Sequence, residues 1–275
     1  MVENALSMEK PILIASFYKF VPLPDYRDLR QPILDFCRAV GLRGTILLAH
    51  EGINATIAGE RPAVEAALSY LRADPRLADL LVKESFHDAI PFGRLKVRLK
   101  REIVALKVSG VDPRARVGAY VEPEDWNRLI TQDDVLLLDA RNDYEVRMGS
   151  FRGSKNPRTD SFHELPRYLA QTLDPAKHKR IAMFCTGGIR CEKATAFLLN
   201  EGFQEVYHLR GGILHYLEKV KPEDSLWEGE CFVFDERVSL DFSLQKGSIT
   251  ICDDCKAVVK VTDEACLRCG STNFL

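Results

Sequence analysis

A cysteine followed by two glycines and an arginine carries the clearest chemistry in this sequence. The segment Cys185-Thr-Gly-Gly-Ile-Arg190 follows an apolar run, Ile181-Ala-Met-Phe184, that is typical of a buried strand. Glycine permits a tight, partly left-handed turn, and a helix that starts there directs free N–H groups and its dipole at an anion. We therefore expect Cys185 to be an easily ionised nucleophile. The expected anion cradle consists of Thr186, Gly187, Gly188, Ile189 and Arg190.

The length of this loop narrows the chemistry. Only four residues separate Cys185 from Arg190, fewer than cysteine phosphatases use to wrap a tetrahedral phosphate. The shorter loop resembles that of rhodanese (sulfurtransferase) domains, whose cysteine carries a persulfide. The alternative is a structural cysteine at a glycine-rich turn, which does not need the arginine. For Cys191 two interpretations stay open: a resolving thiol for Cys185, or a half-buried cysteine in the first turn of the helix.

Asp139 and Arg141 end a second apolar run, Val135-Leu-Leu-Leu138, and are expected to support the site. We expect them to form an ion pair and hydrogen bonds that fix the loops around Cys185, rather than to act in catalysis directly. The spacing of several later residues also resembles the rhodanese pattern: Glu145, Gly149, Gly153, Asn156-Pro157 and Leu209-Arg-Gly-Gly-Ile213.

Four cysteines near the C-terminus have the spacing of metal ligands. Cys252 and Cys255 form one C-x-x-C pair, Cys266 and Cys269 form another, and ten residues separate the pairs. Each pair presents two thiolates from one tight turn, and four thiolates close a tetrahedral zinc site. We expect structural zinc, with a redox pair or metal-free cysteines as alternatives. Catalytic zinc is disfavoured because four thiolates leave no open position.

A basic segment precedes the second half of the chain. In the two-residue period of a strand, the side chains of Arg94, Lys96, Arg98 and Lys100 share one face. Four cations on a nearly neutral protein are candidates for contact with the phosphate backbone of a nucleic acid. A solvated sheet face explains the pattern equally well.

Composition indicates an ordinary globular protein with room for several domains. The chain has 275 residues, 46% of them hydrophobic, and a net charge of −2. Residues 1–10 have no apolar h-region, and no apolar run approaches the length of a membrane span, so we expect a cytoplasmic protein. Eight cysteines then favour thiol chemistry and metal binding over disulfides. The sequence has no Walker loop and no dinucleotide (NAD) or flavin signature.

The elements that must position these residues fall into α+β and α/β parts. Residues 1–110 show the order β-α-β-β-α-β, which is typical of a ferredoxin-like (acylphosphatase-like) sandwich, with the last strand expected over 95–106. Residues 111–125 are expected to be a linker. Residues 126–222 are expected to form a rhodanese α/β domain with a parallel sheet, with a helix over 192–200 after the cysteine loop. Residues 223–275 form a cysteine-rich C-terminal extension.

The whole chain resembles the bacterial oxygen-dependent tRNA uridine hydroxylases, which carry a rhodanese domain. The cysteine-rich tail is more compact than in that family. The resemblance rests on four segments in the family's order: Gly44-Thr-Ile-Leu-Leu-Ala-His-Glu-Gly-Ile-Asn54, Asp139-Ala-Arg141, Cys185-Thr-Gly-Gly-Ile-Arg-Cys-Glu-Lys193 and Trp227-Glu-Gly-Glu-Cys-Phe-Val-Phe-Asp235.

This resemblance implies hydroxylation of the wobble uridine of tRNA at C5, giving 5-hydroxyuridine, with dioxygen as co-substrate. It implies Cys185 as the active-site residue, acting through a persulfide. Two routes are open: the thiolate adds to C6 of a flipped uracil, or the persulfide supplies reducing equivalents. Two alternatives belong to other functional classes. One is a rhodanese-type sulfurtransferase acting on a small sulfur donor, and the other is a persulfide carrier that serves a tRNA-modifying partner.

Overall fold

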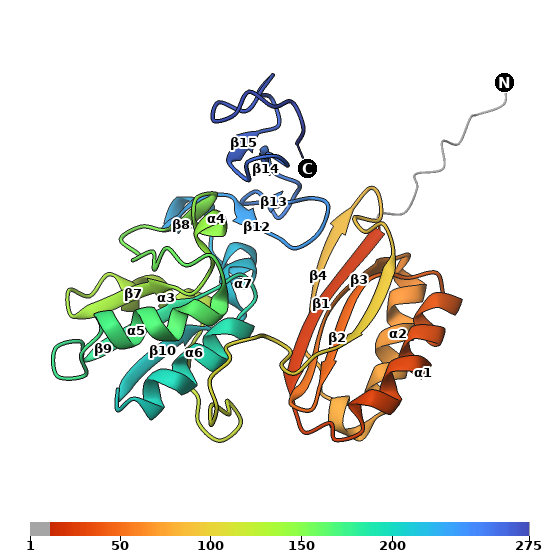
Figure 1. Cartoon of the computed structure of the whole chain (residues 1–275), viewed down its shortest axis with the longest axis horizontal. Coiled ribbons are helices and arrows are strands. Elements are labelled where there is room, and N and C mark those ends of the chain that lie inside the picture. The colour runs from red at the N-terminus through yellow and green to blue at the C-terminus, as the bar shows by residue number, and fades with distance from the viewer. Residues whose placement is uncertain (1–11, 275) are drawn as a thin grey trace. The chain divides into compact units, whose positions relative to one another are not determined.

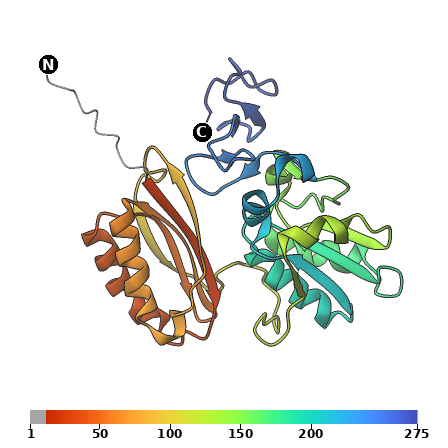
Figure 2. The same cartoon turned by 180° about the vertical axis from the view of Figure 1, so that it is seen from behind.

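The chain folds into two compact units, which divide between Ile103 and Val104 in a computed structural model that describes residues 12–274 (Figures 1 and 2). The segment 1–10, expected not to be a signal peptide, lies outside the described residues. Across residues 12–274, no helix combines the length and hydropathy needed to span a membrane.

The N-terminal unit is a five-stranded sheet with two helices packed on one face (Figure 1). The strand order is β4-β1-β3-β2-β5, in which β5 pairs with β2 in parallel and the other neighbours are antiparallel. This is the ferredoxin-like, acylphosphatase-like sandwich predicted from the sequence, with β5 added at one edge. Its elements are β1 (Ile12–Phe20), α1 (Tyr26–Ala39), β2 (Arg43–Ala49), β3 (Gly52–Gly59), α2 (Arg61–Arg72), η1 (Pro75–Leu77), β4 (Val82–His87) and β5 (Leu95–Leu99).

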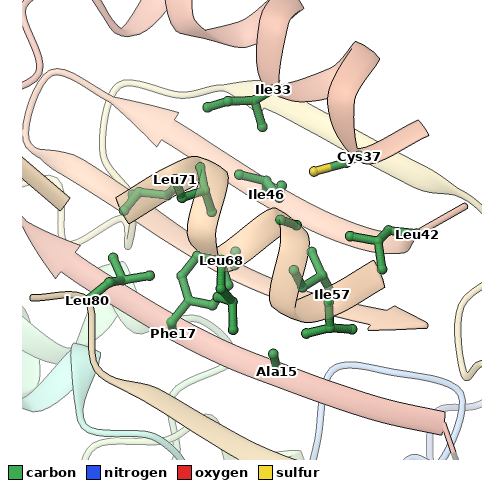
Figure 3. Close-up of a cluster of buried hydrophobic side chains, with 14 of the residues drawn as sticks. Ala15, Phe17, Ile33, Cys37, Leu42, Ile46, Ile57, Leu68, Leu71 and Leu80 are labelled. Atoms are coloured by element: carbon green, nitrogen blue, oxygen red, sulfur yellow. The ribbon is translucent and has the colours of Figure 1, made fainter. Parts of the chain in front are cut away.

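The core of this unit lies between the sheet and the two helices (Figure 3). Ala15 and Phe17 of β1 point into it, together with Ile33 of α1 and Leu68 of α2. Because side chains alternate along a strand, the neighbours of these inward-facing residues lie on the opposite side of the sheet. We call that side the outer face and define it by Ser16, Thr45, Thr56, Lys96 and Arg98.

The second unit contains a four-stranded parallel sheet of order β6-β10-β9-β7, the predicted rhodanese domain. Helices α5 and α6 contribute to the buried cluster on one face, and α3 and α7 to the cluster on the other. The elements are β6 (Ala119–Val121), α3 (Pro123–Ile130), β7 (Val135–Asp139), α4 (Asp143–Val146), β8 (Gly149–Phe151), η2 (Phe162–Glu164), α5 (Leu165–Thr172), β9 (Arg180–Phe184), α6 (Ile189–Asn200), β10 (Glu205–Leu209), α7 (Gly212–Lys219) and η3 (Pro222–Asp224).

The C-terminal extension is tied to this domain by a strand pair. β11 pairs with β8 antiparallel, and the Trp227 ring packs edge-on against Phe151, with ring centroids 5.3 Å apart. The turn of a final hairpin, β14–β15, holds Cys252 and Cys255, and Cys266 and Cys269 follow β15. The strands of the extension are β11 (Trp227–Gly229), β12 (Cys231–Phe232), β13 (Ser239–Leu240), β14 (Ile249–Ile251) and β15 (Val258–Lys260).

Three boundaries differ from the expectations. β5 ends at Leu99 rather than at 106, because Glu51 accepts a hydrogen bond from the Ile103 N–H (2.6 Å) and Asn54 donates one to the Ile103 carbonyl (3.0 Å), which draws the chain off the sheet edge. The stretch 111–125 contains β6, which is too short to leave a periodic pattern. α6 begins at Ile189 rather than at 192, because Gly188, with φ of 102°, turns the chain directly into the helix.

Candidate active site

Cys185 lies at the carboxyl end of β9, where the cysteine loop turns into α6. Its side chain is fully buried, and the Gly188 N–H donates a hydrogen bond to Sγ at 3.1 Å. Carboxyl ends of parallel strands are where open α/β sheets hold their ligands. The structure therefore confirms the expected position of Cys185 between a strand and a helix.

The environment of Cys185 stabilises its thiolate. Burial alone raises the pKa of the thiol, but four interactions outweigh that effect: a hydrogen bond from the Cys191 thiol, the positive charge of Arg190, and the N–H groups of Cys191 and Gly188. Together they lower the pKa of Cys185 to about 5. The sulfur is thus an anion at neutral pH, which is the reactive form.

Arg190 is held in place by Glu145. The two guanidinium N–H groups donate to the two carboxylate oxygens at 2.6 and 2.7 Å, and one also reaches Thr186 Oγ1 at 3.3 Å. Both partners are buried, and burial opposes both charges, yet their attraction keeps the pKa of Glu145 lowered and that of Arg190 raised. Sequence reasoning placed Glu145 only in the rhodanese pattern, since nothing local reveals its partner 45 residues away.

Asp139 and Arg141 form a second buried pair beside this one. The Arg141 guanidinium donates to both Asp139 oxygens at 2.9 and 2.6 Å, and the Arg141 N–H donates to Oδ1 at 3.0 Å. Arg141 also donates to the Gly149 carbonyl (2.6 Å), while the Ser150 hydroxyl donates to Asp139 (2.7 Å). The pair thereby joins the end of β7 to the β8 loop.

The thiol of Cys191 is fully buried in the first turn of α6, rather than half-buried. Burial raises its pKa well above the ordinary value, and the neighbouring Cys185 thiolate raises it further. Cys191 is therefore protonated at neutral pH, where Cys185 is ionised, and it donates a hydrogen bond to the Cys185 sulfur.

The Leu209-Arg-Gly-Gly-Ile213 motif holds the other side of the cysteine loop. The Ile213 N–H donates to the Cys185 carbonyl at 2.9 Å, and the Leu214 N–H donates to that of Thr186 at 3.2 Å. Gly212 makes this approach possible, because a Cβ there would lie 2.4 Å from the Cys185 oxygen. The φ of Gly212, 70°, also favours glycine.

The four cations of the basic segment belong to the N-terminal unit. Lys96 and Arg98 lie on β5, opposite Thr45 and Leu47 of β2, while Arg94 and Lys100 flank the strand. The alternation is as expected, since Val97 between them is buried in the core. Arg94, Arg98 and Lys100 are exposed and Lys96 is half-buried.

The four C-terminal cysteines converge. Their Sγ atoms all lie within 4.8 Å of one another, with Cys252–Cys269 at 3.6 Å and Cys255–Cys266 at 3.5 Å. Tetrahedral zinc with Zn–S bonds of about 2.3 Å requires separations of about 3.8 Å, so the cluster fits the ion. Each pair sits on a tight turn closed by an N–H donated to the first cysteine's carbonyl, from Lys256 (2.9 Å) and from Gly270 (2.7 Å).

The fold and the cysteine loop define a rhodanese-like protein with an additional N-terminal domain. The family model for the rhodanese-like domain matches residues 122–219, and that for the UPF0176 acylphosphatase like domain matches residues 12–103. Among solved structures, the NMR structure of a rhodanese-like domain from Anabaena sp. aligns with 40% of this chain and 78% of that one, at 18% identity and a TM-score of 0.34.

Two curated relatives match nearly the whole chain. A protein of Picosynechococcus sp. is 55% identical over 255 residues, covering 93% of this chain and 86% of the relative. One of Teredinibacter turnerae is 53% identical over 266 residues, covering 94% and 83%. Both are named tRNA uridine(34) hydroxylase, and the present chain belongs to that family.

Proposed function

We propose that this chain is a tRNA uridine hydroxylase that oxidises the wobble uridine, position 34, at C5 to give 5-hydroxyuridine. The observation that carries the proposal is the 53–55% identity to two proteins of that name along almost the full chain. A tRNA substrate is consistent with a cytoplasmic protein. The N-terminal unit, the rhodanese domain and the extension all lie within the matched length.

In this proposal Cys185 is the catalytic nucleophile. Its thiolate adds to C6 of the uracil, and the electron density that this places on C5 makes C5 nucleophilic toward an oxidant. Dioxygen is the proposed oxygen source. Inserting one of its atoms at C5 leaves the other to be reduced to water by two electrons and two protons. Loss of the C5 proton then expels the Cys185 thiolate from C6 and restores the C5–C6 double bond. On this route an external two-electron reductant supplies the electrons, because Cys185 cannot carry a persulfide while its sulfur is bonded to C6. On the alternative route no adduct forms, and a Cys185 persulfide supplies the two electrons as its outer sulfur is oxidised from the thiol to the sulfenic level; that persulfide is detectable in the intact protein as a mass increase of one sulfur atom.

The proposed RNA contact is the outer face of the N-terminal sheet with its basic edge. Four polar residues are paired in sequence across neighbouring strands: Ser16 of β1 with Thr56 of β3, Thr56 with Thr45 of β2, and Thr45 with Lys96 of β5. Arg98 continues the basic edge, and the rings of Tyr18 and Phe20 lie on the same side of β1, with centroids 6.2 Å apart. Hydroxyls and cations suit phosphate and ribose, and aromatic rings on a sheet suit unpaired bases.

Zinc is proposed as a structural ion held by Cys252, Cys255, Cys266 and Cys269. Four thiolates would complete its coordination, so its contribution would be folding energy for the hairpin β14–β15.

The decisive experiment is mass spectrometry of tRNA nucleosides from cells that lack this protein. We expect 5-hydroxyuridine and its derivatives to disappear, to return with the wild-type chain, and to stay absent with Cys185→Ala. Cys37→Ala, which changes a buried cysteine of the other unit, is the matched control and should restore them. Loss of only thiolated uridines would instead support the sulfurtransferase or persulfide-carrier function and overturn the proposal.

A further inference from the structure

An aromatic residue whose ring is mostly exposed to solvent lies beside the cysteine loop. Phe234 follows β12 in the C-terminal extension, and 64% of its surface is accessible to solvent. Its ring lies over the Arg190 guanidinium, with Cζ 5.8 Å from the ring centroid. Arg190 is itself part of the loop that stabilises the Cys185 thiolate. The extension therefore supplies an apolar surface at the rim of the active site.

The turn that presents Phe234 is held rigidly. Asp235 and Arg237 form an ion pair in which both side chains are only 3% exposed, with N–O distances of 2.7 and 2.9 Å. The Arg237 N–H also donates to Asp235 (3.0 Å), and the Val233 N–H donates to the Val238 carbonyl (2.8 Å). A buried ion pair and a closed turn flank a side chain that is itself mostly in solvent.

Aromatic contacts connect Phe234 to the residues that line the site. Its ring meets Phe232 edge-on at 4.9 Å, and Phe232 meets Tyr144 edge-on at 5.2 Å. Tyr144 directly precedes Glu145, the partner of Arg190. Phe234 is thus fixed from two directions, through Arg190 and through Phe232, in an orientation set by the active-site loops.

We propose that Phe234 is the stacking residue for the target uracil, which lies against the ring as it leaves the anticodon loop for Cys185. The inference rests on the function proposed above. A base that flips out of the anticodon loop loses its stacking contacts with the adjacent bases. An aromatic side chain next to the cysteine loop replaces one of these stacking contacts. Arg190 beneath the ring adds a cation to the same stack. Phe234 is a positioning residue, because it orients the base for a reaction that Cys185 performs.

The test compares Phe234→Ala, Phe234→Leu and Phe234→Trp in steady-state hydroxylation of tRNA. We expect Phe234→Ala to lower kcat/KM by about 10- to 100-fold, the loss expected for stacking one base. Phe234→Trp should retain most of the wild-type kcat/KM, because tryptophan also offers an aromatic face for stacking. Phe234→Leu should retain little, because leucine is apolar but cannot stack. Phe86→Ala is the matched control: Phe86 is also exposed (40%) and also lies under an arginine, Arg61 at 5.5 Å, but in the other unit.

A second measurement does not depend on hydroxylation. An anticodon stem-loop with 5-iodouridine at position 34 should crosslink under ultraviolet light to the peptide that contains Phe234, and the crosslink should disappear in Phe234→Ala. Unchanged kinetics of Phe234→Ala, or a crosslink that maps elsewhere, would overturn the inference. A stem-loop that crosslinks at Phe234 in a protein without hydroxylase activity would keep the inference and refute the reaction.

Discussion

At Cys185, ionisation is decided by several small dipoles more than by one large charge. Arg190 lies close to the sulfur, but it is neutralised in a bidentate pair with Glu145. The N–H groups of Gly188 and Cys191 and the Cys191 thiol all point at Sγ as donors. A thiolate stabilised in this way keeps its charge through hydrogen bonds from fixed donors, without an arginine or lysine paired to it alone.

The reactivity of Cys185 should therefore show an acidic midpoint. Its rate of alkylation by iodoacetamide, followed by peptide mass spectrometry, should rise with pH to half-maximum near pH 5 and stay level above it, because the thiolate is the reacting form. Cys37 is an internal control, since burial raises its pKa to about 11 and it should not react at neutral pH. A midpoint for Cys185 near 9, the ordinary value, would contradict the proposed environment.

At the scale of elements, the cysteine loop is held between β9 and the start of α7. The N-terminus of α7 approaches so closely that only glycine fits at 212. Glu145 of α4 and Arg190 of α6 fix the opposite side. Four elements, β9, α4, α6 and α7, thus determine the shape of a six-residue loop.

Replacing Gly212 by alanine should disrupt that loop. The new Cβ would meet the Cys185 carbonyl, so we expect hydroxylation to fall by at least about 10-fold together with the melting temperature. Gly202→Ala is the matched control, because Gly202 also has a positive φ (92°) but no atom within 4 Å of the new Cβ. The Gly202→Ala variant should lose about 1 kcal/mol of folding free energy and keep its hydroxylation activity. Equal losses in the two variants would show that strain alone explains the effect.

The edge strand β5 is the element to test for RNA binding. Replacing Lys96 and Arg98 together by glutamine should weaken tRNA binding and reduce the slope of log K against log salt by about 0.7 for each phosphate that is no longer neutralised. The control is Arg27→Gln with Arg38→Gln, since both arginines are exposed on α1, on the other side of the sheet. If the α1 variant matches the β5 variant in a filter-binding salt titration, the outer face is not the RNA surface.

At the scale of the whole molecule, the extension has two roles that its length alone does not suggest. β11 pairs with β8, and the ring of Phe234 contacts Arg190 of the cysteine loop. Around the cysteine pairs the extension's own buried cluster, within residues 12–274, is only Cys252, Val259 and Cys266. So small a core needs a further constraint to stay folded, and four convergent thiolates provide one if they bind metal.

Purified protein should accordingly contain about one zinc ion per chain by elemental analysis. Cys266→Ser should lower the zinc content and reduce the melting temperature of the extension by more than about 5 °C. Cys37→Ala should keep the zinc, because Cys37 lies in the core of the other unit. Full stability of Cys266→Ser together with metal-free wild-type protein would favour metal-free cysteines.

The sequence by itself determined the local features of this protein. Apolar runs and glycine positions specify β9 and its loop, and the ferredoxin-like order follows from alternating periodicities. Spacing alone also indicates that Cys252, Cys255, Cys266 and Cys269 converge. These features depend on neighbours in the chain, so the pattern carries them.

Only the tertiary structure decided what acts on Cys185 from a distance. Glu145 reaches Arg190 across 45 residues, and Phe234 comes to the same arginine from the C-terminal extension. That position 212 has room only for glycine is likewise visible only in the structure, where the start of α7 contacts the cysteine loop. Such contacts depend on how separate elements pack. A sequence pattern can identify each residue but cannot show that the two residues are in contact.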